Sequence, residues 1–200
     1  MIGNSDAKVG GLLLAAGGST RFGSPKQLAR FHGKTLLRNA VEAITGAGCS
    51  SVVVVLGANA EESAKELEGL DVCSVINENW QTGMSSSIQV GLSELMNHEP
   101  ALDAVLITLM DQPLITAEHL VGFVERFNDE RPSIIASAYN EVTGVPALFS
   151  SELFDELDKL GGEKGARELI RNRAGVMTVA LEEAAIDIDT PKDQTGQTPD

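Results

Sequence analysis

The sequence predicts one α/β domain with three layers, in which helices cover both faces of a mainly parallel sheet. Two observations support this fold class. Short apolar runs alternate with amphipathic stretches along most of the 200 residues, as expected of βαβ units. In addition, neither an internal repeat nor a linker rich in Pro, Gly or Ser divides the chain. We therefore expect a single domain over residues 1–200, with frayed ends at 1–8 and 192–200.

The first half of the chain contains the clearest strand and helix patterns. Val9–Ala15 is an apolar run of strand length, and the four consecutive valines in 51–56 indicate a strand covered on both faces. Thr35 can cap a helix that runs to about Thr45, with its apolar side chains on one face. The remaining elements expected here are a helix over 60–67, a strand over 72–76, a polar loop over 77–83 and a helix over 84–96.

The second half continues the alternation. An apolar strand over 104–109 ends at the segment Met110-Asp111-Gln112-Pro113, and Thr116 can cap a helix that runs to Phe127. The other expected elements are strands over 133–137, 146–149 and 176–181, helices over 151–160 and 165–172, and a polar tail from Pro191.

The charge distribution restricts the class of ligand. The formal net charge is −14, and a uniformly acidic surface repels nucleic acids and anionic membranes. However, residues 9–41 contain no Asp or Glu and carry Arg21, Lys26, Arg30, Lys34 and Arg38. This cationic stretch indicates a small polyanionic ligand that is bound locally, although chance clustering on a solvated helix face is the alternative.

Several other classes of protein are disfavoured. No apolar run approaches the roughly 20 residues that span a bilayer, and the run after Lys8 lacks a signal-peptide cleavage context, so we expect a cytoplasmic protein. Cys49 and Cys73 form no CxxC pair, and the three histidines lack metal-ligand spacing. We therefore expect neither a disulfide framework nor a His-based metal site or Cys–His nucleophile.

A loop rich in Gly and Ser, Gly17–Pro25, follows the first strand. Its glycines allow backbone N–H groups to approach an anion, and Arg21 and Lys26 add charges that can bind phosphate oxygens. The lysine at position 26 comes too late for a Walker A loop, and Ala16-Gly17-Gly18 breaks the GxGxxG dinucleotide fingerprint. The segment therefore predicts a phosphate-binding loop of another kind, with a tight strand-to-helix turn as the alternative.

Carboxylates occur at two places that suit a hard divalent cation. Asp111 follows an apolar strand, and alternation puts Asp187 and Asp189 on the same side of an extended segment. Mg²⁺ favours one or two carboxylates together with phosphate oxygens. The alternatives are a turn residue at Asp111 and a polar chain end at 187–189.

The segment L-A-A-G-G-S-T-R-F-G-S-P-K (14–26) resembles the signature of nucleotidyltransferases related to molybdenum cofactor cytidylyltransferase and molybdopterin-guanine dinucleotide synthase. The similarity continues in the family's order at N-E-N-W-Q-T-G-M-S-S-S-I (77–88), D-Q-P (111–113), G-E-K-G-A-R (162–167) and D-I-D-T-P (187–191). The double alanine and the segments G-M-S-S-S and G-E-K-G-A-R are more similar to the cytidylyl branch than to the guanylyl branch.

The resemblance implies a Rossmann-like nucleotidyltransferase fold and a Mg²⁺-dependent reaction. A nucleoside monophosphate would move from an NTP, with CTP favoured, to a phosphate-bearing acceptor such as molybdopterin, and pyrophosphate would be released. A molybdenum enzyme or a chaperone is the implied protein partner. The residues that the resemblance implies are Ala15, Ala16, Gly17 and Gly18 in the nucleotide site, Arg21 and Lys26 on the phosphates, Gly83 and Ser86 at the base and ribose, and Asp111 with Asp189 on the metal, with Arg21, Lys26 and Asp111 as the catalytic set.

Some alternatives stay open at this point. The family usually has His-Pro after a glycine where this chain has Gly144-Val145-Pro146, which leaves the acceptor undecided. A guanylyltransferase, a sugar- or polyol-phosphate cytidylyltransferase and a non-catalytic nucleotide-binding protein are the rival functions. Trp80 and Tyr139 are the only Trp and Tyr, and each could stack on a planar ring or simply pack in the core or at its rim.

Overall fold

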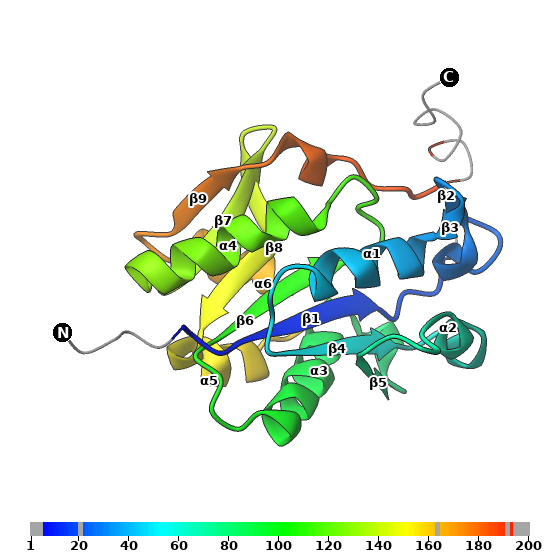
Figure 1. Cartoon of the computed structure of the whole chain (residues 1–200), viewed down its shortest axis with the longest axis horizontal. Helices are drawn as coiled ribbons and strands as arrows, with labels where there is room; N and C mark the ends of the chain where they lie inside the picture. Colours follow the sequence, from blue (N-terminus) through cyan, green and yellow to red (C-terminus); the bar gives the residue numbers. More distant parts are fainter. Residues whose placement is uncertain (1–5, 20–21, 163–164, 191–192, 194–200) are drawn as a thin grey trace.

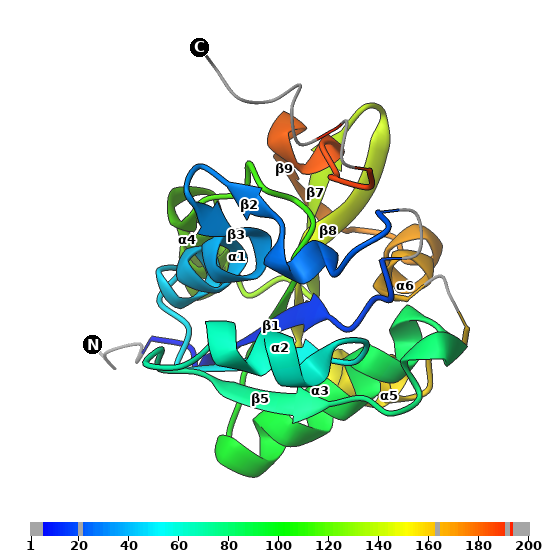
Figure 2. The same ribbon diagram turned by 90° about the vertical axis from the view of Figure 1, so that its right-hand side faces the viewer.

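Figures 1 and 2 show a computed structural model of the chain, which describes residues 6–19, 22–162, 165–190 and 193. Seven strands form one sheet in the order β5-β4-β1-β6-β8-β7-β9, in which only β8 runs antiparallel to its neighbours β6 and β7. The strands are β1 (Val9–Ala15), β4 (Ser51–Leu56), β5 (Cys73–Ile76), β6 (Ala104–Leu109), β7 (Ile134–Tyr139), β8 (Val142–Ser150) and β9 (Met177–Ala180). The predicted three-layer fold with a mainly parallel sheet is therefore confirmed.

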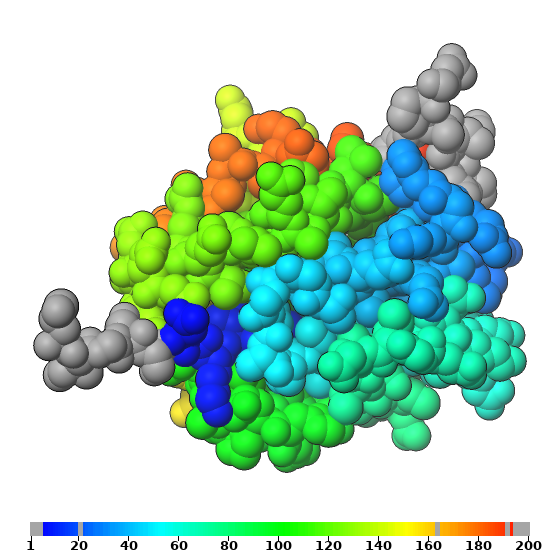
Figure 3. All heavy atoms as spheres, viewed as in Figure 1, coloured from blue at the N-terminus to red at the C-terminus, as the bar shows by residue number. Residues whose placement is uncertain are grey.

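Helices cover both faces of this sheet. The helices are α1 (Leu36–Thr45), α2 (Ala60–Glu66), α3 (Met84–His98), α4 (Ala117–Glu130), α5 (Phe154–Asp158) and α6 (Ala166–Asn172). Helices α1 and α4 pack together on one face, where their atoms form a continuous layer (Figure 3), whereas α3, α5 and α6 lie on the other face (Figure 2). In the described part of the chain, no helix combines the length and the apolar composition needed to cross a membrane.

The central strand β1 is buried along its whole length because both of its faces are covered. Its alternate side chains point to opposite sides: Leu13 belongs to the core under α1 and α4, and Leu12 and Leu14 belong to the core under α3. The predicted bounds of β1, β4 and β6 agree with the structure. Thr35 caps α1 as predicted, since its hydroxyl accepts a hydrogen bond from the Arg38 backbone N–H.

Two-residue turns explain where the structure departs from the predicted elements. Strands β7 and β8 are joined by Asn140 and Glu141, which both have positive φ, as a tight hairpin turn of primed type requires. This turn extends β8 back to Val142, although the strand was predicted only over 146–149. A second hairpin was not predicted. It joins β2 (Arg30–Phe31) to β3 (Lys34–Thr35) through two residues that also have positive φ.

Other differences concern element ends. Helix α4 continues to Glu130 beyond the predicted Phe127, and α3 continues to His98 beyond residue 96. The helix predicted over 151–160 is a 3-10 turn followed by the short α5. The frayed ends that the sequence predicts at 1–8 and 192–200 lie outside the described residues, except for 6–8 and 193.

Gly91 lets α3 lie close against the sheet. A Cβ atom at this position would be 2.3 Å from Leu12 Cδ1 and 2.6 Å from Val55 Cγ2, which are shorter than normal contacts. By contrast, Gly122 in α4 has open space where a Cβ atom would be.

We therefore expect Gly91→Ala to lower the free energy of unfolding by about 1–3 kcal/mol, since the strands and α3 must separate to admit the methyl group. The matched substitution Gly122→Ala should raise it by about 0.4–1 kcal/mol, because alanine restricts the unfolded chain and is accommodated in the helix. Urea unfolding of both variants measures the difference. Equal effects of the two substitutions would contradict the packing argument.

Candidate active site

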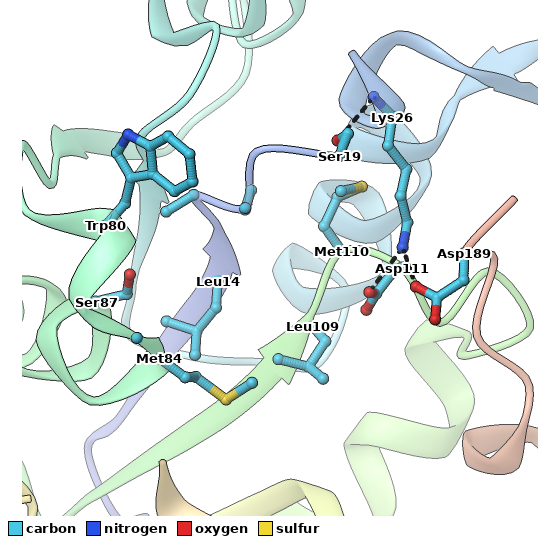
Figure 4. A pocket seen from close by; sticks show the side chains of 14 residues that line it. Leu14, Ser19, Lys26, Trp80, Met84, Ser87, Leu109, Met110, Asp111 and Asp189 are labelled. Carbon is cyan, nitrogen blue, oxygen red and sulfur yellow. Dashed lines mark hydrogen bonds and ion pairs between the residues drawn. The ribbon is translucent and has the colours of Figure 1, made fainter. Parts of the chain in front are cut away.

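The carboxyl ends of β1 and β6 open onto a cavity of about 300 Å³. Ligands of open α/β sheets bind at this edge, beyond the ends of the strands. Figure 4 shows Trp80, Met84 and Ser87 on one side of the cavity and Lys26 with two aspartates on the other. The lining residues are Leu14, Ala15, Ala16, Gly17, Ser19, Lys26, Trp80, Gly83, Met84, Ser87, Leu109, Met110, Asp111 and Asp189.

A buried glutamine shapes the loop after β1. Gln27, whose side chain is fully buried, donates from Nε2 to the carbonyl oxygens of Ala15 (3.0 Å) and Gly17 (2.9 Å). Ser19, which has a φ of 52°, donates from its hydroxyl to Gln27 Oε1 and accepts from the backbone N–H of Lys26 (3.1 Å). These bonds fold the loop back on itself, so that Lys26 begins the 3-10 turn Lys26–Leu28 at the cavity wall.

Lys26 connects two carboxylates that are far apart in the sequence. Its Nζ lies 2.9 Å from Asp111 Oδ2 and 3.1 Å from Asp189 Oδ1. The side chain of Lys26 is only 8% exposed, whereas those of Asp111 and Asp189 are 29% and 40% exposed. The ammonium group is therefore enclosed by protein, and the two carboxylates form the open rim of the ion-pair network.

Backbone contacts bring the two aspartates together. The N–H of Ile188 donates to the carbonyl oxygen of Asp111 (2.9 Å), and the Ile188 side chain is fully buried. On the other side, Asp193 accepts hydrogen bonds at Oδ2 from the backbone N–H groups of Asp189 (3.1 Å) and Thr190 (2.7 Å). The segment 187–189, for which a polar chain end was the alternative interpretation, is thus attached to the end of β6.

Another buried amide holds the segment that follows β6. Gln112 donates from Nε2 to the carbonyl oxygens of Val145 (3.2 Å) and Ala184 (2.8 Å), and its side chain is buried. Val145 is itself buried, with 3% of its surface exposed. Gln112 therefore connects the Asp111 segment to both β8 and the 3-10 turn Glu182–Ala185.

A third carboxylate experiences the negative charge of this network. The pKa of Asp187 is raised from 3.8 to about 6, first because the surrounding protein removes part of its hydration and then because Asp111 and Asp189 repel its ionised form. Lys26 and Arg167 oppose this shift. Burial and repulsion by the two other carboxylates therefore outweigh the nearby cations at Asp187.

The opposite wall of the cavity is organised by a buried asparagine. Asn77 donates from Nδ2 to the hydroxyl oxygens of Ser86 (2.8 Å) and Ser87 (3.0 Å) and accepts at Oδ1 from the Asn79 N–H (2.9 Å). Ser87 lines the cavity, whereas Ser86 donates its hydroxyl to the carbonyl of Gly83 (2.8 Å) beside it. The serine that faces the cavity is therefore the neighbour of the one that the family resemblance implied.

Trp80 lies directly over the glycine-rich loop. A Cβ atom on Gly18 would be 2.5 Å from the Trp80 ring, so only glycine permits this contact. Trp80 is partly buried and lines the cavity, so its ring serves as packing for the loop and also borders the ligand space. Tyr139, in contrast, is buried on β7, where its hydroxyl accepts from Arg167 Nη2 (3.3 Å).

Most of the predicted site residues come together around this cavity. Ala15, Ala16, Gly17, Lys26, Gly83, Asp111 and Asp189 line it. Gly18 and Ser86 lie just behind the lining, and Arg21 lies outside the described residues. Sequence reasoning missed Gln27 and Asn77. A buried amide in a polar loop has no pattern that separates it from a solvated one.

The donor set suits a hard divalent cation, although it is small. No group of three or more metal-ligating side chains occurs among the described residues. Two carboxylates that converge on one point nevertheless match the way Mg²⁺ is usually held, with phosphate oxygens and water as the other ligands. Asp111 and Asp189 are therefore the residues that could hold such an ion.

Comparison with known proteins places this fold among the nucleotidyltransferases. Residues 11–177 match the model of the MobA-like NTP transferase domain, so the chain belongs to that family, as its motifs predicted. The chain is 30% identical over 197 residues to the nicotine blue oxidoreductase of Paenarthrobacter nicotinovorans, covering 91% of this chain and 92% of that protein. It is 25% identical to the bifunctional protein GlmU of Bifidobacterium animalis, of which it spans only 40%.

Solved structures share this fold. Rv0371c from Mycobacterium tuberculosis H37Rv superimposes with a TM-score of 0.84 at 26% identity, covering 96% of this chain and 98% of that one. A structure of Rv0371c in complex with manganese has a TM-score of 0.78 at 25% identity, with 94% and 97% of the two chains covered.

The Gln27 contacts generate a first prediction for the site. Gln27→Met should lower the free energy of unfolding by about 1–3 kcal/mol, because buried carbonyl oxygens lose their donor. It should also weaken nucleotide binding, since the loop loses its shape. Gln89→Met is the matched control, because Gln89 likewise donates to two carbonyls, those of Asp158 and Leu160, away from the cavity. A Gln27 variant with unchanged affinity for a nucleotide in calorimetry would contradict this role.

The raised pKa of Asp187 generates a second prediction. The folded chain keeps a proton on Asp187 up to about pH 6, whereas the unfolded chain releases it near 3.8. In a chelator, the free energy of unfolding should therefore fall as the pH rises from about 4 to about 6. Asp187→Asn should lack this fall and exceed the parent in stability at pH 7. The control Asp155→Asn, at an exposed position on α5, should still show this fall in the free energy of unfolding. If the fall disappeared in both variants, its assignment to Asp187 would be contradicted.

Proposed function

We propose that this chain transfers a nucleoside monophosphate from an NTP, with CTP preferred, to a phosphate-bearing acceptor such as molybdopterin and releases pyrophosphate. The observation that carries the proposal is the convergence of one ammonium group and two carboxylates from three segments, beside a glycine-rich loop at the carboxyl edge of the sheet. Membership of the MobA-like NTP transferase family supports it.

The residues present suit this chemistry. An oxygen of the acceptor phosphate would form a bond to the α-phosphorus of the NTP, and the bond to the β-phosphate would break, so that pyrophosphate leaves. A phosphate monoester has a second pKa of about 6 and is already dianionic near neutral pH, so no dedicated base is needed. The protein must instead neutralise and orient two anions. Lys26, Arg21 and the backbone N–H groups of the glycine-rich loop would do this by binding phosphate oxygens.

We assign the metal to Asp111 and Asp189 and favour Mg²⁺. When bound, the ion would neutralise charge on the triphosphate. The manganese complex of Rv0371c supports a divalent cation in a protein of similar fold. Lys26, in contrast, can move its ammonium group along a flexible stem to any phosphate oxygen within reach.

The preference for CTP rests on the wall that faces Lys26. The segment 83–87 resembles the cytidylyl branch, and Gly83, Met84 and Ser87 line the cavity there. The Ser87 hydroxyl oxygen accepts from Asn77, so its own hydrogen can be donated to the edge of a base. A pocket with such fixed polar groups penalises a base that leaves them unpaired.

The chain departs from the family pattern at Val145, in the segment that bears on the acceptor. Val145 replaces the family's usual histidine and is buried in β8, so it offers no side-chain hydrogen bond to an acceptor. A related phosphorylated acceptor in place of molybdopterin, or GTP in place of CTP, is therefore the alternative within the same reaction. With molybdopterin as the acceptor, a cytoplasmic molybdenum enzyme or its chaperone would receive the product.

The identity to nicotine blue oxidoreductase favours a second candidate function. That relative matches over nearly the whole of both chains, so this chain could catalyse a reduction in the same cavity. The broken dinucleotide fingerprint at Ala16-Gly17-Gly18 disfavours this function. An ion-pair network of Lys26 with two aspartates is also better suited to phosphate and metal than to hydride transfer.

One assay separates these functions. Pyrophosphate release is measured with each of four NTPs against metal-free and metal-loaded molybdopterin, and oxidation of NADH and NADPH is followed in parallel with nicotine blue as the electron acceptor. We expect pyrophosphate with CTP and a phosphorylated acceptor, and a lower kcat/KM with GTP. Equal or better kcat/KM with GTP would overturn the base preference. Reduction that depends on NADH or NADPH, without pyrophosphate release, would favour the second candidate.

The carboxylates give the corresponding prediction for variants. Asp111→Asn keeps the shape of the side chain and removes its charge, so turnover should fall by about 100-fold or more, as when one preorganised electrostatic contact is lost. The turnover of Asp189→Asn should also fall, and a higher Mg²⁺ concentration should partly restore the turnover of both variants. Asp155→Asn, on the exposed surface of α5, controls for the loss of one negative charge. Parental turnover of Asp111→Asn at low Mg²⁺ would show that this carboxylate is only a turn residue.

A further inference from the structure

Lys26 lies at the point on which the two candidate metal ligands converge. The ammonium nitrogen is within 3.1 Å of a carboxylate oxygen from each of Asp111 and Asp189. A divalent ion between the same oxygens would need distances of about 2.0–2.1 Å for Mg²⁺ and would then lie in contact with the ammonium group. The ammonium and the ion therefore compete for one position, both by volume and by charge.

The surroundings of Lys26 favour the ammonium in that position when no ligand is present. Its backbone N–H is fixed by the Ser19 hydroxyl, and its side chain is 8% exposed. Two carboxylates at about 3 Å offset the cost of desolvating this ammonium group, and its removal would leave them without that compensation.

A bound triphosphate would change this balance. Lys26 lines the cavity together with Gly17 and Ser19 of the glycine-rich loop, so phosphate oxygens in the cavity would lie within reach of its four-carbon stem. The ammonium could then exchange carboxylate oxygens for phosphate oxygens without moving its backbone. The carboxylate oxygens that Lys26 contacts would then be able to bind a divalent ion.

We propose that Lys26 occupies the cation position in the nucleotide-free protein and leaves it when a triphosphate binds, so that the divalent ion is admitted together with the nucleotide. This inference rests on the proposed function, since it requires that the cavity binds an NTP. It makes Lys26 a positioning residue for the metal as well as a phosphate ligand. Linkage then requires that nucleotide and metal strengthen each other's binding by the same factor.

The test measures Mn²⁺ binding to the whole chain by the electron paramagnetic resonance signal of the free ion, with and without α,β-methylene-CTP. Without nucleotide, Lys26→Met should bind Mn²⁺ roughly tenfold or more tightly than the parent, because the competing ammonium is gone. Lys159→Met, on the exposed surface after α5, removes the same charge elsewhere and should bind like the parent. Adding Asp111→Asn to Lys26→Met should abolish the gain, which assigns it to this site.

With the analogue present, the parent should bind Mn²⁺ more tightly than it does without the analogue, and by more than the analogue's own Mn²⁺ binding in buffer explains. The increase in Mn²⁺ affinity should be smaller for Lys26→Met. The comparison of the parent with and without the analogue does not depend on whether any variant folds. Equal Mn²⁺ affinities of the parent and Lys26→Met without nucleotide would overturn the inference, and so would tight Mn²⁺ binding by the parent that the analogue leaves unchanged. Failure of the analogue to bind the parent at all would instead overturn the proposed function, so the two failures are distinguishable.

Discussion

The ion-pair network around Lys26 is the interaction on which the organisation of this edge of the molecule depends. It joins the loop after β1 to the end of β6 and to the segment that follows β9, across 85 and 163 residues of sequence. An enclosed ammonium group is tolerated only when carboxylates surround it, and removal of one partner leaves a poorly solvated charge. The same contacts that hold the three segments together therefore also define the polar end of the cavity.

Three buried amides position the irregular segments around this network. Gln27 holds the loop after β1, Gln112 holds the segment after β6, and Asn77 holds the serines at the start of α3. Each one donates to backbone carbonyl or side-chain hydroxyl oxygens in the surrounding segments, because a buried amide N–H group needs an acceptor. Site geometry here depends on the side chains behind the cavity as much as on those that line it.

The central strands of the sheet could be predicted from the sequence more accurately than the antiparallel strand β8. Strands β1, β4 and β6 are covered on both faces, so their apolar runs end where burial ends. The antiparallel β8 was underestimated, because its length depends on a two-residue turn at Asn140 and Glu141 that lacks the usual glycine. For the site, sequence motifs predicted Lys26, Asp111 and Asp189. The hydrogen bonds through which Gln27 shapes the loop cannot be predicted from the spacing of residues along the chain.

The charges around the cavity also constrain how a nucleotide can enter it. Asp111, Asp187 and Asp189 are near one another, and burial together with repulsion from the other two raises the pKa of Asp187, although Lys26 and Arg167 oppose this shift. A bare triphosphate would meet this negative potential, in a chain whose net charge is already −14. A nucleotide that brings a divalent cation reverses the interaction, because the carboxylates that repel phosphate are those that attract the ion. Under the proposed function, the acidic residues of this cavity would thus favour the metal-bound form of the nucleotide over the free one.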